Sequence, residues 1–146
     1  MNFKRMSNKV KIYLDDVRTP VKLYEWLVVR SYDEFIKAVE DVGFENIDFV
    51  SLDHDLGDSA IKEYHNSKDR EINYDNITEK TGMDVAKWLV DQWLDGKPQF
   101  NVRIHSHNSV GARNMESYIN NYLKKDPKSF SIAFLFKTQT RDDNNR

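Results

Sequence analysis

The sequence predicts a single α/β domain of three layers, in which a five-stranded, mostly parallel sheet lies between helices on both of its faces. Two observations predict this class. Short apolar segments typical of strands alternate along the chain with amphipathic segments typical of helices. Four of the five predicted strands also end in polar or charged residues, and in parallel sheets ligands bind beyond these carboxyl ends.

The first two predicted strands are residues 9–16 and 25–31. Only residues 17–24 connect them, whereas a parallel crossover usually needs a dozen residues or more. An antiparallel second strand, however, would reverse the direction of the third strand, so that its acidic end would lie far from the acidic end of the first strand. We therefore expect a parallel second strand, reached by an extended loop that bends at Pro20.

The middle of the chain contains the first helix, the third strand and a long polar segment. Ser31 and Glu34 form a capping box at the start of the helix, and Gly43 supplies its C-terminal stop. Residues 47–56 are the third strand. Residues 57–80 are polar and too long for a simple connection, which predicts a lid, a binding loop or disorder.

Two further helices flank the fourth strand. Thr81 begins a helix that ends at Gly96, residues 101–108 are the fourth strand, and residues 110–123 carry the apolar stripe of the third helix. Residues 130–138 are the predicted fifth strand.

The composition predicts one soluble domain over residues 1–146, with flexible tails at 1–8 and 139–146. The absence of cysteine excludes disulfides, thiolate metal ligands and cysteine nucleophiles. No apolar segment is long enough for export or a membrane span, so we expect a cytoplasmic protein without a membrane partner. With 24 acidic and 22 basic side chains, general DNA binding is not expected, and any phosphate site must be local. The composition does not indicate an oligomeric state.

Carboxylates end the first and third strands. Asp15, Asp16 and Asp53 would converge at one edge of the sheet, and three carboxylates share a site only around a cation or with a bound proton. We expect Mg²⁺ or Mn²⁺, with Zn²⁺ as the alternative if histidines take part. These aspartates could instead simply cap turns and helices. The period of two places Asp53 and Asp55 on one face and His54 on the other, which favours Asp53 as the metal or phosphate residue.

Histidines and other polar residues end the fourth strand. His105 and His107 alternate, so both should point to the same face, where either could ligate metal or transfer a proton. Each could also be a hydrogen-bonded structural histidine, and His105 is the preferred functional one. Asn108 or Ser109 can cap the next helix, whose free N–H groups could bind a phosphate oxygen. Arg18 is either a phosphate clamp or the ion-pair partner of a neighbouring aspartate.

The order of these residues resembles that of response-regulator receiver domains. The resemblance implies a receiver or flavodoxin-like fold with strand order 2-1-3-4-5. It also implies roles for five residues: Asp15 and Asp16 as Mg²⁺ ligands, Asp53 as phosphoacceptor, Ser106 as the hydroxyl and Lys137 as the phosphate partner. The sequence departs from that pattern because it has no helix between the first two strands and has additional histidines.

Four motifs resemble a narrower family, the cyclic-phosphate-processing receiver domain (cREC) of bacteria and tailed phages. They are LDDVRTP, SLDHDLG, TGMDVAKWL and IHSHNSVGARNM, within about residues 11–123. The resemblance implies a phosphoesterase that acts on cyclic phosphates of nucleotides or RNA ends. An Asn- and Lys-rich composition would fit a phage-encoded member.

These expectations combine into a metal-dependent phosphodiesterase for a cyclic phosphate of a small nucleotide or an RNA end. Asp15, Asp16 and Asp53 would hold the ion, and His105, or as second choice His54, would protonate the leaving alkoxide. The residues expected to contact phosphate are Arg18, Ser106, Asn108 and Lys137. The alternative is a receiver-like domain without turnover, which binds a phosphorylated ligand or nucleotide or accepts phosphate on Asp53.

Overall fold

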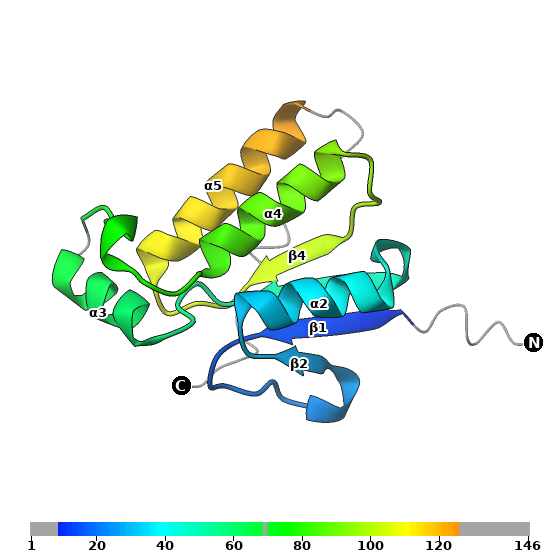
Figure 1. The fold of residues 1–146 in the computed structure, drawn as a ribbon, viewed down its shortest axis with the longest axis horizontal. Coiled ribbons are helices and arrows are strands. Elements are labelled where there is room, and N and C mark those ends of the chain that lie inside the picture. The colour runs from blue at the N-terminus through cyan, green and yellow to red at the C-terminus, as the bar shows by residue number, and fades with distance from the viewer. Residues whose placement is uncertain (1–8, 69, 126–146) are drawn as a thin grey trace, which may run out of the picture.

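A computed structural model describes residues 9–68 and 70–125 of the chain (Figure 1). Its elements in chain order are β1 (Val10–Leu14), η1 (Leu23–Glu25), β2 (Leu27–Val29), α2 (Tyr32–Val42), η2 (Phe44–Asn46), β3 (Ile47–Leu52), α3 (Asp58–Ser67), η3 (Tyr74–Asn76), α4 (Gly82–Leu94), β4 (Asn101–Ile104) and α5 (Ser109–Lys125). The predicted fifth strand, Lys137 and the two predicted tails lie outside the described residues. Among the helices described, none is long and apolar enough to cross a membrane.

The four described strands form one parallel sheet in the order β2-β1-β3-β4. The predictions of a parallel second strand and of the order of these four strands are therefore confirmed. Between β1 and β2 the chain runs through a loop whose only regular element is η1, preceded by Lys22 in the left-handed conformation with φ 64°.

The three long helices α2, α4 and α5 all pack on one face of the sheet. Their buried side chains form a single core cluster with alternate strand residues, which include Ile12, Leu14, Val50, Leu52, Val102 and Ile104. The crossovers from β2 to β3 and from β3 to β4 step across the sheet in the same direction, and right-handed crossovers then place their helices on the same face. The step from β1 to β2 runs the other way, so its connection belongs to the opposite face, and that connection is too short for an α-helix. Over residues 9–68 and 70–125, the prediction of helices on both faces is thus not confirmed.

Local capping signals predicted the starts of two helices. The hydroxyl of Ser31 accepts a hydrogen bond from the Glu34 N–H at 3.1 Å, and α2 ends at Gly43 with φ 94°. Thr81 and Asp84 form a reciprocal capping box at the start of α4. Both helix starts are confirmed, because the side chains that cap a helix lie within a few residues of the N–H groups they satisfy. At α2 the predicted box is half formed, since the Glu34 carboxylate accepts from the Arg30 N–H at 2.8 Å.

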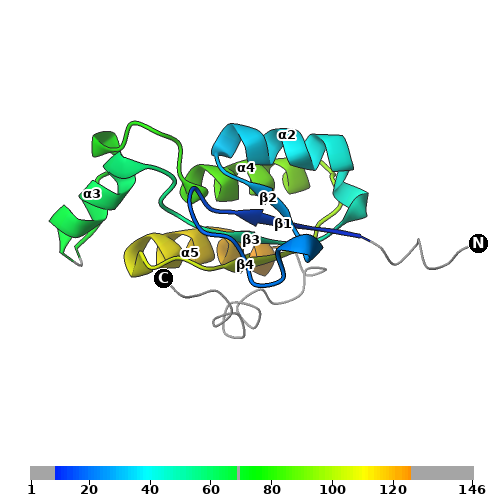
Figure 2. The same ribbon diagram turned by 90° about the horizontal axis from the view of Figure 1, so that it is seen from below.

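Residues 57–68 and 70–80 form a folded unit around helix α3. This helix lies beyond the carboxyl ends of the strands in both views (Figures 1 and 2). The Glu79 carboxylate accepts a hydrogen bond of 2.9 Å from the Ala60 N–H in the first turn of α3. The Tyr74 hydroxyl lies 2.9 Å from Nε2 of His54 and so attaches the unit to the end of β3. The described residues of this segment therefore have a defined structure, and the predicted alternative of disorder is not confirmed for them.

Candidate active site

A cleft of about 370 Å³ lies at the carboxyl ends of the strands, with α3 forming one of its walls. Predicted site residues from three separate segments line this cleft, and they are Asp16, Arg18, Asp53, Ser106 and Asn108. Adjacent parallel strands bring them together, since Leu14 of β1 pairs with Leu52 of β3 and Leu52 with Ile104 of β4. Polar residues that directly follow these strands therefore meet at one edge of the sheet.

Three carboxylates form a cluster at this edge. Asp15, Asp16 and Asp53 each offer one oxygen, and the three oxygens all lie within 4.8 Å of one another. Asp15 is fully buried and Asp53 is almost so. Carboxylate oxygens at this spacing suit a hard divalent cation such as Mg²⁺ or Mn²⁺, so the chemistry of the donor set fits the implied metal.

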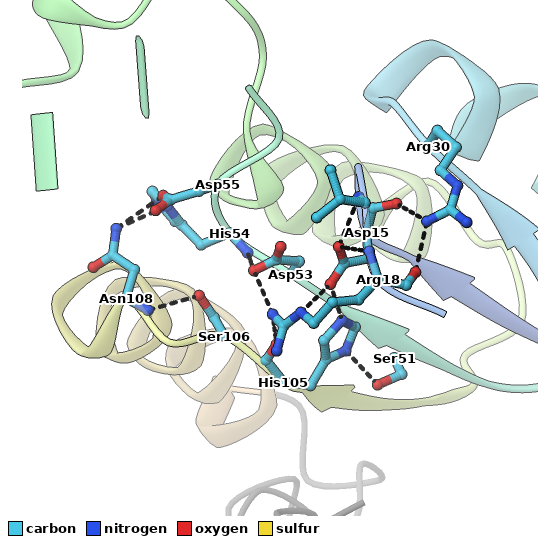
Figure 3. Close-up of polar contacts among 11 residues, drawn as sticks. Asp15, Arg18, Arg30, Ser51, Asp53, His54, Asp55, His105, Ser106 and Asn108 are labelled. Carbon is cyan, nitrogen blue, oxygen red and sulfur yellow. Dashed lines mark hydrogen bonds and ion pairs between the residues drawn. The ribbon is translucent and has the colours of Figure 1, made fainter. Parts of the chain in front are cut away.

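Hydrogen bonds stabilise the ionised form of Asp15 despite its burial (Figure 3). Its Oδ1 accepts from the N–H groups of Val17 at 3.0 Å and Arg18 at 2.8 Å. Its Oδ2 lies 2.9 Å from Nε of Arg18 and 3.1 Å from Nε2 of His105. Burial alone would raise the pKa of Asp15, but the bonds from His105 and from the two N–H groups outweigh it and hold the pKa well below its usual range.

Asp53 has the opposite environment. Burial and the negative charge of Asp15 raise the pKa of Asp53 to about 8, against the lowering effects of Arg18 and of a hydrogen bond from Ser106. Without a cation, the carboxyl of Asp53 therefore keeps its proton at neutral pH. A divalent ion that displaced this proton would neutralise the second negative charge that appears beside Asp15.

Arg18 makes the ion pair that was one of its two predicted roles. Its Nε lies 2.9 Å from Asp15 Oδ2, and its Nη2 lies 3.6 Å from Asp53 Oδ1. Nη2 also donates to the carbonyl of His105 at 3.2 Å. Arg30 fixes this loop by donating to the carbonyls of Asp15 and Arg18. No sequence motif indicated the contribution of Arg30, because this residue follows β2 and reaches the site only through the pairing of β2 with β1.

His105 lies inside the protein and contacts Asp15. Its Nδ1 lies 2.7 Å from the Ser51 hydroxyl and its Nε2 lies 3.1 Å from Asp15 Oδ2 (Figure 3). The ring stacks on Tyr13 with centroids 4.3 Å apart and planes inclined by 8°. These contacts fix the ring and suit it to orient Asp15. Ser51 could have been found from the sequence, because the period of two puts it on the same face as Asp53.

His54 is also buried, and it contacts Asp55. Its Nδ1 lies 2.6 Å from Asp55 Oδ1, while its Nε2 contacts Tyr74. Asp53 and Asp55 line the cleft and His54 does not, which agrees with the expectation from the period of two. The position of His54 suits it to hold Asp55 and the 57–80 unit.

Asn108 caps the N-terminus of α5, and it was one of the two residues predicted for this role. Its Oδ1 accepts from the Gly111 N–H at 2.8 Å, and its Nδ2 donates to Asp55 Oδ1 at 2.9 Å. Its own N–H donates to the Ser106 hydroxyl at 3.1 Å. A side chain at Gly111 would overlap the ring of His54, so the helix can approach β3 this closely only with glycine. The side-chain amide of Asn108 thus holds the framework of the site together.

The histidines that line the cleft are His107 and His65, and both are exposed. The expected alternation of His105 and His107 does not hold, because β4 ends at Ile104 and the chain turns before α5. His105 points into the protein and His107 lies at the cleft. His65 reaches the cleft because residues 58–67 form a helix.

A family model described as the cyclic-phosphate processing receiver domain matches residues 10–121. The chain belongs to this family. Comparison with curated proteins and with solved structures gave no significant match. The matched residues of this cyclic-phosphate processing receiver domain extend from β1 into α5 and include every described cleft residue named above.

Metal binding by this receiver domain should depend on pH through Asp53. A cation must displace the proton that the raised pKa of Asp53 retains, so affinity is full above the folded pKa of about 8 and falls below it. Calorimetric titration with Mn²⁺ should show an affinity that drops about tenfold per pH unit below this value, with about one proton released per ion. An affinity that does not change between about pH 6.5 and about pH 8.5 would contradict the role of Asp53 as a ligand.

Ser51 should influence the candidate metal site of this receiver domain through His105. Replacing Ser51 with Ala leaves Nδ1 of His105 without the hydroxyl and loosens the ring that orients Asp15, so Mn²⁺ affinity should fall about tenfold. Ser51→Thr keeps a hydroxyl at this position and should restore most of the affinity. If the Ala and Thr variants bind Mn²⁺ equally well, the hydroxyl does not act on the site.

Proposed function

We propose that this domain is a metal-dependent phosphodiesterase that opens a cyclic phosphate of a nucleotide or of an RNA end. The observation that carries the proposal is the cluster of Asp15, Asp16 and Asp53 oxygens within 4.8 Å at the edge of a cleft. Mg²⁺ or Mn²⁺ is the expected ion, with Zn²⁺ as the alternative. When bound, such an ion supplies positive charge that polarises a phosphoryl oxygen.

Arg18 and Ser106 are suited to bind the phosphate because both line the cleft beside Asp53. Arg18 is paired with Asp15 and Asp53, so its guanidinium is fully available to a substrate only when another cation neutralises these carboxylates. The metal would then bind first and the substrate second. The fork of N–H groups on Arg18 suits two non-bridging phosphate oxygens.

His107 is the proposed proton donor. Its side chain is exposed and lines the cleft next to Ser106. His105 and His54 are buried, and their ring nitrogens contact Ser51, Asp15, Asp55 and Tyr74. In the reaction, a water oxygen bonds to phosphorus and releases one proton to solvent, while one ring P–O bond breaks. The leaving oxygen takes a proton from the imidazolium of His107, which solvent then reprotonates. His105 and His54 would act indirectly, by positioning Asp15 and Asp55.

Turnover of nucleoside 2′,3′-cyclic and 3′,5′-cyclic monophosphates tests the proposal. In Mn²⁺ or Mg²⁺ the protein should release product in excess of its own concentration, and a chelator should stop the reaction. His107→Ala should lower kcat about a hundredfold or more while leaving Mn²⁺ affinity unchanged. Recovery of every cyclic phosphate unchanged, with each metal, would overturn the proposal.

The alternative without turnover has one observation in its favour. Asp53 and Ser106 follow β3 and β4 and interact, as a phosphoacceptor and its hydroxyl would. A small phosphodonor such as acetyl phosphate should then label the protein up to one phosphate per chain, and Asp53→Asn should abolish the label. The ratio of product to protein therefore separates the two functions.

A further inference from the structure

Helix α3 has an inverted surface pattern. Its buried residues are Ala60, Glu63 and Ser67, whereas Ile61 is 39% exposed and lines the cleft together with Tyr64. A surface helix normally buries its large apolar side chains and exposes its charged ones. An apolar side chain that is exposed in a cleft is a common mark of a ligand-binding surface.

The contacts of Glu63 hold the helix in this orientation. Its carboxylate accepts from the Asn73 N–H at 2.9 Å and from Nδ2 of Asn76 at 2.8 Å. If α3 rolled to bury Ile61, both bonds would break and a carboxylate would lose its partners. Glu79, bonded to the first turn, fixes the other end of the helix. The wall is therefore built before any ligand arrives, which reduces the entropy cost of binding.

The cleft combines two kinds of surface. Its sheet edge carries the carboxylates and Arg18, while α3 contributes Ile61 and the ring of Tyr64, flanked by Asp58 and His65. A ligand that matches both has an anionic group joined to a flat apolar body with polar edges. A phosphate attached to a nucleoside has this chemistry, because any nucleobase can stack on an aromatic ring. The cleft volume of about 370 Å³ is near the lower limit for small-molecule sites and suits one nucleotide unit.

We propose that the cleft face of α3 is a nucleobase subsite in which the base stacks on Tyr64 and packs against Ile61. This inference rests on the proposed function, because the phosphate site at the sheet edge fixes where the base falls. Asp58 and His65 lie beside the stacked base, where they can meet its polar edge. Tyr64 and Ile61 are thus specificity residues, and the strand ends carry the reaction.

The test compares a substrate with a base and one without. A nucleoside 2′,3′-cyclic monophosphate should have a lower KM than glycerol 1,2-cyclic phosphate at similar kcat. Tyr64→Ala should reduce this preference about tenfold to a hundredfold through KM, since stacking on one aromatic ring contributes about that much. Tyr64→Phe should keep the preference, and Tyr24→Ala, at an 82% exposed position outside the cleft lining, is the control. If Tyr64→Ala does not fold, Ile61→Asn replaces it.

Two results would overturn the subsite. One is equal KM for both substrates in the unaltered protein, and the other is an unchanged preference in Tyr64→Ala or Ile61→Asn. An oligoribonucleotide that ends in a 2′,3′-cyclic phosphate is assayed beside the mononucleotide, and the lower KM shows whether an RNA end or a free nucleotide is preferred. A lower KM for either of them than for glycerol 1,2-cyclic phosphate supports the subsite. If no cyclic phosphate is cleaved, the proposed function fails but the subsite is still tested. Calorimetric binding of a nucleoside 3′-monophosphate and of glycerol phosphate in Mn²⁺ then shows whether the base adds affinity that Tyr64→Ala removes.

Discussion

Replacing Asp53 with Asn is expected to abolish metal-dependent turnover and, without metal, to stabilise the protein. The amide keeps the shape of the carboxyl but cannot be charged, so it removes a metal ligand and also the repulsion with Asp15. Because the folded pKa is raised from 3.8 to about 8, the carboxyl of Asp53 favours the folded state fully only at low pH. That contribution is lost as pH rises through 8. At about pH 8.5 the free energy of unfolding of the variant should therefore be about 2 kcal/mol higher than that of the unaltered protein.

Urea unfolding at two pH values, with and without Mn²⁺, checks this prediction. Below the ordinary pKa of 3.8 the carboxyl is protonated in both states, and the gain should disappear. With saturating Mn²⁺ the unaltered protein should be the more stable of the two, because only its folded state is stabilised by binding the ion. A variant that is less stable than the unaltered protein at high pH without metal would show that Asp53 is not under strain.

Replacing Arg18 with Met is expected to destabilise the metal-free protein strongly and to weaken phosphate binding. The guanidinium pairs with both Asp15 and Asp53, and its side chain is 13% exposed. Removing it leaves a buried, ionised Asp15 with fewer partners, which should cost about 3 kcal/mol. Mn²⁺ should restore a large part of that stability, so the rise in Tm on adding metal should be larger in the variant than in the unaltered protein.

Lys37→Met is the matched control for this variant. Lys37 pairs with Asp41 at 2.7 Å, but both side chains are exposed, at 76% and 64%. Solvent screens such a pair, so its loss should leave Tm and metal affinity unchanged. If Arg18→Met behaves like Lys37→Met, Arg18 does not neutralise the acidic cluster.

Much of the site could be predicted from local signals. Acidic residues directly after β1 and β3 meet because adjacent parallel strands end together, and this placed Asp15 beside Asp53. The caps at Ser31, Thr81 and Asn108 depend on N–H groups only a few residues away, so short motifs are enough to identify them.

The features that could not be predicted depend on contacts between distant residues. Glu79 caps a helix that begins at Asp58, and no capping motif spans that distance. Residues 58–67 bury Glu63 and expose Ile61, which hides the usual helical pattern of apolar residues. The inward position of His105 depends on Ser51, which lies in another strand.

The hydrogen bond between Glu79 and the first turn of α3 closes residues 57–80 at their base, so the segment leaves the domain and returns to it at one place. A segment whose two ends meet can change its length or sequence without moving β3 or α4. The wall proposed to contact the base of a ligand could therefore diverge without disturbing the strand-end carboxylates. Members of the family could in this way keep the carboxylate cluster and exchange the surface proposed to select the ligand.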